Sequence, residues 1–246
     1  PGTVPSLLRG FSAPVRLDAG WSEEDLAFLA GSDDDPFGRW EALQSLSTRA
    51  LLAMVRALRA GQPAALDQRV VEAFRASLSD DRLEPAFLAE LLALPGESLL
   101  GQALDVWYVD EVHAARAEAR RVLGETLFDT WSALYERLSA AEPAGGVDLS
   151  TAAMGRRALA NAALAYMVAS GREEGVRHAV AQARPDGTMT RVMGALIALN
   201  DLERPERDAA LAAFHDRWRH DPLVLDKWFA LKAGSARADT LDQVRA

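Results

Sequence analysis

Residues 33–58, DDDPFGRWEALQSLSTRALLAMVRAL, decide the fold class of this chain, because they combine a helix start with a long apolar helical pattern. Pro36 disfavours helical geometry at Asp35 and itself suits the first helical position, so Asp35 can serve as the N-cap. Three negative charges ahead of a helix also complement its macrodipole. The apolar positions that follow recur at helical spacing: Trp40, Leu43, Leu46, Ala50, Leu51, Met54, Val55 and Leu58. The stretch predicts a long, well-buried helix.

The same aspartates allow a second interpretation, a calcium-binding loop of the EF-hand type. Counted from Asp33, the first, third and sixth positions of such a loop fit, the sixth being Gly38. The fifth position is Phe37, which supplies no oxygen, and the twelfth is Gln44 where the loop needs a bidentate glutamate. Helix initiation therefore explains more of these residues than cation binding does.

Helical patterns extend over the rest of the chain after Gly20. Ser22 is the expected N-cap of a first helix that should stop at Gly31. Further helices are predicted near 36–60, 66–79, 85–94, 108–122, 124–139, 149–170, 172–183, 188–200, 205–220, 222–232 and 238–246. The predicted breaks fall at Gly61 and Pro63, Asp80 and Asp81, Pro95 and Gly96, Pro143 to Gly146, Gly171, and Pro185 to Gly187.

Such short breaks make neighbouring helices mostly antiparallel, as in bundles and α-solenoids. We therefore predict an all-α fold, an irregular α-solenoid of stacked antiparallel helical hairpins of the armadillo or HEAT kind. Residues 4–18, interrupted by prolines and a glycine, should form a short extended segment ahead of it. No fixed repeat of 40 to 47 residues is visible. The one echo is an Asp-Pro start followed by tryptophan, at Asp35 with Trp40 and at Asp221 with Trp228.

Composition limits the classes of function. The chain has 246 residues, 49% of them hydrophobic, and a formal net charge of -9, which argues against a nucleic-acid partner because that affinity comes mainly from neutralising phosphates. It contains no cysteine, so disulfides and thiolate metal sites are excluded. No apolar run reaches the roughly 20 residues that a membrane-spanning helix needs, and the first residues do not look like a signal peptide. We expect a cytoplasmic protein without a membrane partner.

A search for catalytic motifs finds none. A His-Glu-x-x-His segment, which would place two zinc ligands and a base on one helix face, is absent, and the four histidines are His113, His178, His215 and His220. His215 and His220 are five apart and should lie on a solvated surface. The sequences GREEG (171–175) and PGESLLG (95–101) lack the context of a phosphate loop, and no Gly-x-Ser-x-Gly elbow occurs. We expect no catalytic, cofactor-binding or metal-ligating residue in this chain.

The other polar and aromatic clusters suit structural roles. Acidic residues from Asp110 to Glu125 alternate with Arg116, Arg120 and Arg121 and predict a salt-bridged solvent face. Four of the six tryptophans lie on apolar helical stripes, which favours core packing over a ligand cage: Trp40, Trp131, Trp218 and Trp228.

Four blocks of sequence carry a resemblance to a known family: FSAPVRLDAGWSEEDLAFLAGSDDDPFGRWEALQSL (11–46), GQPAALDQRVVEAFRASL (61–78), EPAFLAELLALPGE (84–97) and VLDKWFALKA (224–233). Together they resemble the C-terminal part of bacterial aminopeptidase N, the gluzincin zinc aminopeptidases also called alanyl aminopeptidases. The resemblance spans nearly the whole chain. It implies that 1–18 is an extended linker or the last strand of a preceding β domain. It also implies that 19–246 is the armadillo-like C-terminal domain, with further helices after Ala246.

The resemblance also implies a role. In that family the zinc site and the Gly-Ala-Met-Glu-Asn motif belong to an upstream catalytic domain, and neither motif occurs in this chain. The chain is then a fragment that should be inactive alone. Its partner would be the catalytic domain of the same polypeptide, whose substrates are peptides trimmed from their N-terminus. The implied task is to cap the catalytic cleft and limit access to it, and because the fragment lacks both head and tail, no cleft-lining residue is assigned.

Two other classes of function remain open. A free-standing helical-repeat scaffold would bind a protein partner through a concave face. A calcium-modulated module would use the aspartates from Asp33 to Asp35. The absence of an initiator methionine before Pro1 and of a stop signal at DTLDQVRA leads us to expect a piece of a longer protein.

Overall fold

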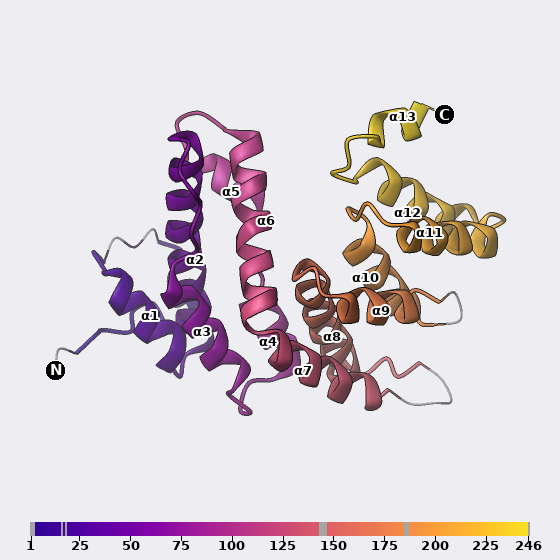
Figure 1. The fold of residues 1–246 in the computed structure, drawn as a ribbon. Coiled ribbons are helices and arrows are strands. Elements are labelled where there is room, and N and C mark those ends of the chain that lie inside the picture. The colour runs from indigo at the N-terminus through magenta and orange to yellow at the C-terminus, as the bar shows by residue number, and fades with distance from the viewer. Residues whose placement is uncertain (1–2, 16, 18, 143–146, 185–186, 246) are drawn as a thin grey trace. The chain divides into compact units, whose positions relative to one another are not determined.

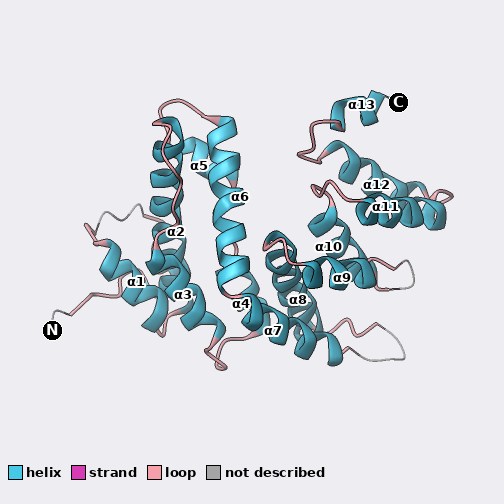
Figure 2. Ribbon diagram, viewed as in Figure 1, coloured by secondary structure: helices cyan, strands magenta, loops and turns pink. Residues whose placement is uncertain are grey.

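Helices are the main regular structure in the part of the chain that can be described. The computed structural model describes residues 3–15, 17, 19–142, 147–184 and 187–245, and these ranges contain thirteen α-helices, one short 3-10 helix and no strand (Figure 2). The predicted all-α class is confirmed. By its internal contacts the chain divides into two compact units, Pro1–Leu127 and Phe128–Ala246.

Unit 1 is built around one long helix. Its elements are the 3-10 helix Arg9–Phe11 (η1), α1 (Glu23–Ser32), α2 (Pro36–Arg59), α3 (Gln68–Leu78), α4 (Pro85–Leu91), α5 (Glu97–Gln102) and α6 (Val109–Thr126) (Figure 1). Every other element of the unit contacts α2. The core of unit 1 therefore lies along the apolar stripe that the sequence predicts for this helix.

The start of α2 confirms the prediction made from its sequence. Asp35 is the N-cap, its Oδ2 accepts a hydrogen bond from the backbone N–H of Gly38 at 2.8 Å, and Pro36 occupies the first helical position. Six of the eight predicted stripe residues are buried, whereas Trp40 and Leu58 are half-buried at its ends. The helix combines a strong local start signal with a continuous buried face.

Helix α1 begins as predicted but ends later. Ser22 and Asp25 form a reciprocal capping box, in which the serine hydroxyl accepts from the Asp25 N–H and the Asp25 carboxylate accepts from the Ser22 N–H. The predicted stop at Gly31 is wrong, because the helix continues through Ser32 and Gly31 keeps an ordinary backbone conformation there. Gly31 instead lies close to Ala76 of α3.

Unit 2 is arranged around α8. Its helices are α7 (Phe128–Ala140), α8 (Thr151–Ala169), α9 (Glu173–Gln182), α10 (Met189–Leu199), α11 (Pro205–Trp218), α12 (Pro222–Ala233) and α13 (Thr240–Arg245). Helices α7, α9 and α10 all pack on α8. Trp131 of α7 is fully buried and stacks on Tyr166 of α8 with ring centroids 4.6 Å apart. Gly175 of α9 lies so close to α8 that a Cβ there would sit 2.4 Å from the carbonyl oxygen of Met167.

The differences from the predicted elements concern short segments and boundaries. Helix α5 is absent from the predicted set, because it has six residues and follows Gly96, which supplies no side-chain cap. Helix α6 runs to Thr126 and not to 122. In the N-terminal segment η1 interrupts a backbone that otherwise has no regular structure. The predicted breaks at Pro143 to Gly146 and at Pro185 and Asp186 lie outside the described residues.

Candidate functional site

No metal centre forms among the described residues. Within those ranges, no group of three or more histidine, aspartate or glutamate side chains is placed to hold an ion. The histidines serve other contacts: His113 Nδ1 lies 2.9 Å from Glu97 Oε1, and the His215 ring packs on Trp228 with centroids 4.8 Å apart. Zinc requires three or four convergent ligands. The residues that the structure describes do not fit a zinc site.

The three aspartates before α2 bind the N-terminal segment. Arg9 donates to Asp33 Oδ1 at 3.2 Å and to Asp34 Oδ1 at 2.6 Å, and the Gly10 N–H donates to Asp35 Oδ1 at 2.9 Å. The hydrogen bond from Arg9 lowers the pKa of the exposed Asp34 carboxyl. All three carboxylates therefore accept hydrogen bonds from groups of the protein itself. Their arrangement agrees with the prediction that these aspartates begin a helix.

A buried arginine links three parts of unit 1. Arg39 of α2 donates from Nε to the Ala30 carbonyl of α1 at 3.0 Å and from Nη1 to Asp80 Oδ2 at 2.8 Å, after the end of α3. Asp80 also accepts from Arg82, and the hydrogen bonds from Arg82 and then Arg39 hold the pKa of Asp80 well below its usual range. The network has a structural role, because it joins α2 to the end of α1 and to the segment that follows α3.

Two of the cavities lined by described residues lie one in each unit, and each could hold a small ligand. The first, of about 360 Å³, lies between the N-terminal segment and helices α1 and α2, and its walls include Phe11, Trp21 and Phe37. The second, of about 580 Å³, lies between α10 and α12 and is lined by Met189, Met193 and other residues. Neither gathers a catalytic pair among its lining residues, and the second cavity is the more open to solvent.

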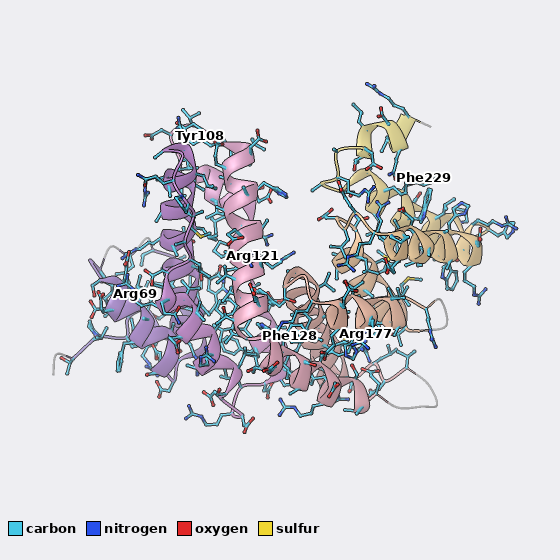
Figure 3. All side chains as sticks on the ribbon, in the orientation of Figure 1. Arg69, Tyr108, Arg121, Phe128, Arg177 and Phe229 are labelled. Atoms are coloured by element: carbon cyan, nitrogen blue, oxygen red, sulfur yellow. The ribbon has the colours of Figure 1, made fainter. Side chains whose placement is uncertain are left out.

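An aromatic surface lies where α5 and α6 meet. Three large apolar side chains are more than half exposed within residues 106–109, and we call them the Trp107 platform: Val106 (56%), Trp107 (52%) and Val109 (60%). The neighbouring Tyr108, labelled in Figure 3 at the end of unit 1 where α6 begins, is covered by Arg59, whose guanidinium carbon lies 3.4 Å from the ring centroid. This surface is a candidate for binding rather than for chemistry.

The remaining candidates from the sequence divide into confirmed and corrected ones. The salt-bridged face of α6 is confirmed at Arg121, which donates to Glu118 and Glu125. Arg116 donates to the Pro95 carbonyl at 2.9 Å. Of the four tryptophans predicted to pack in the core, Trp131 is fully buried, while Trp40, Trp218 and Trp228 are half-buried. The platform was missed, since it depends on a six-residue helix and a loop without apolar periodicity.

No helix of the described residues combines the length and the apolar character that crossing a bilayer would require.

Comparisons with known proteins show which family and which longer proteins this chain is similar to. Residues 23–246 match the model of a family described as "Domain of unknown function (DUF3458_C) ARM repeats". Aminopeptidase N of Escherichia coli (strain K12) is 33% identical over 242 residues, which is 98% of this chain but 27% of the relative. Aminopeptidase N of Caulobacter vibrioides is 36% identical over 244 residues, 99% of this chain and 28% of that protein.

A solved structure gives the same result at the level of the fold. The crystal structure of Legionella pneumophila aminopeptidase A in complex with aspartic acid aligns with 98% of this chain at a TM-score of 0.79 and 27% sequence identity, and the alignment covers 29% of that protein. The chain thus spans between a quarter and a third of each of these proteins. The family's ARM-repeat description also agrees with the predicted armadillo-like hairpins.

Proposed function

This chain belongs to the DUF3458_C ARM-repeat family, and from that premise we propose that it is a non-catalytic helical domain of a zinc-dependent aminopeptidase N. The observation that carries the proposal is the similarity to two aminopeptidases N over 98% and 99% of the chain. It agrees with the resemblance found in the four sequence blocks. The longer enzyme would remove N-terminal residues from peptides in the cytoplasm.

The role of this domain within that enzyme is inferred from its missing zinc motif and from its helical surfaces. The chain carries no His-Glu-x-x-His segment, and its described residues do not fit zinc, so the metal and the reacting groups would belong to the catalytic domain. A stack of helical hairpins has extended surfaces that can lie over a cleft. We infer that this domain covers the catalytic cleft and restricts access to short peptides.

The test is a comparison of hydrolysis by this chain and by the longer polypeptide. With zinc added, an alanine chromogenic anilide should be cleaved by the longer polypeptide and not by residues 1–246. Cleavage by the isolated chain would overturn its non-catalytic role. Inactivity of both would overturn the aminopeptidase assignment and favour a helical scaffold that binds a protein partner.

Access to the cleft needs a second measurement in the active longer polypeptide. The ratio of kcat/KM for an alanine anilide to that for a long, N-terminally alanyl polypeptide reports selection by size. If this domain limits access, Gly175→Leu, which would push α9 away from α8, should lower that ratio by raising kcat/KM for the long substrate. An unchanged ratio in a folded variant would contradict the restrictive role.

A further inference from the structure

The Trp107 indole packs on α5 on one side and is open on the other. A Cβ at Gly101 of α5 would lie 2.5 to 2.7 Å from three atoms of the Trp107 indole, which are Cε2, Cδ2 and Nε1. Three ring atoms at nearly equal distance mean that one face of the indole lies flat on Gly101. Trp107 nevertheless remains 52% exposed, so the opposite face is available to another molecule.

A half-exposed tryptophan that already packs on a neighbouring helix is suited to binding another molecule. Tryptophan is the residue most enriched among those that dominate binding energy at interfaces, and a side chain ordered in advance loses little entropy on binding. Two more exposed apolar side chains, Val106 and Val109, lie within two residues of Trp107 along the chain. A binding segment could therefore contact an aromatic ring and apolar side chains close to it in sequence.

The charges beside the platform indicate what would bind there. Asp105 and Asp110 are both exposed, two residues before and three residues after Trp107. An indole face attracts cations through its quadrupole, and arginine combines this attraction with apolar stacking and with pairing to carboxylates. The chain itself provides the example one residue away, where Arg59 lies 3.4 Å from the centroid of Tyr108.

We propose that the Trp107 platform binds an arginine-bearing segment from the remaining part of the longer polypeptide, with the guanidinium on the open indole face and apolar neighbours on Val106 and Val109. The source of the segment rests on the proposed function, because this chain spans only 27% and 28% of the related aminopeptidases N. The chemistry of the site rests on the platform alone.

The first experiment tests that chemistry with a defined probe. The peptide acetyl-Leu-Arg-Val-Arg-amide is titrated into the chain and followed by the indole N–H signals in NMR, and a peptide with citrulline in place of arginine serves as the neutral control. The arginine peptide should shift the Trp107 signal and the citrulline peptide should not. Trp107→Leu, which keeps an apolar side chain and the net charge but removes the aromatic ring, should weaken binding by about 3- to 30-fold. Equal binding of both peptides, or unchanged affinity of Trp107→Leu, would overturn the proposal.

Charge is tested separately. The double variant Asp105→Asn with Asp110→Asn should weaken the arginine peptide and reduce the salt dependence of its affinity. Because the whole chain is acidic, the matched control is Asp226→Asn with Asp242→Asn, which makes the same change of net charge on α12 and α13. Equal effects of the two double variants would mean only general attraction of a basic peptide and would count against the site.

The second experiment tests the source of the segment. Since the chain contains no cysteine, Val106→Cys introduces one thiol at the platform, and Phe28→Cys introduces one at a similarly exposed position of α1. Labelling rates are measured by peptide mass mapping in residues 1–246 and in the longer polypeptide. Relative to Phe28→Cys, Val106→Cys should react at least about tenfold more slowly in the longer polypeptide.

The two proposals fail in different ways. Equal labelling of Val106→Cys in both polypeptides would exclude the remaining polypeptide as the occupant and would leave a separate protein as the source of any arginine. If the longer polypeptide has no aminopeptidase activity, the proposed function is overturned. The peptide-binding and labelling experiments on the Trp107 platform do not depend on that activity.

Discussion

Helices α2 and α12 begin with the same Asp-Pro capping sequence, but α2 is largely buried and α12 is largely exposed. In each, an aspartate caps the helix, a proline follows at the first helical position, and a tryptophan lies in the first two turns. Nine residues of α2 are buried, whereas in α12 only Leu231 is buried. Leu46 of α2 is 1% exposed, and Leu223 of α12 is 79% exposed.

The comparison separates two kinds of information in a sequence. A cap and a proline fix where a helix begins through local hydrogen bonds and backbone geometry. Burial is decided by what surrounds the helix: α2 contacts all other elements of its unit, while α12 packs on α11 and α13. A strong start signal therefore says little about whether a helix lies in a core.

The largest contrast should come from removing an apolar side chain from each helix. Leu46→Ala should lower the free energy of unfolding by about 2 to 5 kcal/mol, because it leaves a cavity in a closely packed region. Leu223→Ala should change it by no more than about 0.5 kcal/mol. Denaturant unfolding of both variants measures this difference. Similar losses of unfolding free energy in the two variants would contradict the exposed position of Leu223 and would mean that another part of the molecule covers α12.

A smaller effect should follow from breaking the ion pair that anchors α2. Asp80→Asn should cost about 1.5 to 3 kcal/mol at neutral pH, since the charge-assisted hydrogen bonds from Arg39 and Arg82 are weakened. The exposed Asp226 of α12 provides the comparison, and Asp226→Asn should be nearly neutral.

The same pair gives unit 1 a defined dependence on pH. The folded-state pKa of Asp80 is lowered, so its contribution to stability is fully present above the unfolded value of about 3.9 and is lost as the pH falls through the folded value. Wild-type stability should therefore fall more steeply than that of Asp80→Asn when the pH is lowered below about 4. Parallel acid-unfolding curves for the two proteins would contradict this assignment.

The smallest contrast concerns the caps themselves. Asp35→Ala and Asp221→Ala should each cost about 1 kcal/mol, because each removes an acceptor from the first turn. Asp35 also accepts from the Gly10 N–H, so its variant should additionally loosen the N-terminal segment. Hydrogen exchange at the Gly10 and Gly38 amides resolves the two effects. Asp35→Ser should restore protection at Gly38 more than at Gly10.

The fold was largely predictable because its signals are local or periodic. Asp35 with Pro36, the capping serine Ser22 and the apolar stripe of α2 each predicted a feature that the structure contains. Helix α5 could not be found in this way, since six residues without a capping side chain give no period and no start signal. The continuation of α1 through Gly31 shows that glycine ends a helix only where the backbone turns there.

The candidate site was less predictable because it depends on contacts between distant residues. Arg39 lies among apolar residues of α2, and its carboxylate partner is 41 residues further along the chain. The orientation of Trp107 depends on the absence of a side chain at Gly101, which no pattern of polarity records. The absence of a zinc motif was visible in the letters of the sequence, and the resemblance to aminopeptidase N supplied what residue chemistry alone left open.

The close approach of Gly175 to the Met167 carbonyl has a consequence for how the sequence can vary. One added methyl group at this position would meet backbone atoms and not a movable side chain, so it could be accommodated only by separating α9 from α8. The Met167 carbonyl also accepts a hydrogen bond from the Ser170 hydroxyl at the turn between these helices. Position 175 therefore requires glycine for α8 and α9 to keep their present separation, because the space between the two helices holds a hydrogen atom and not a methyl group.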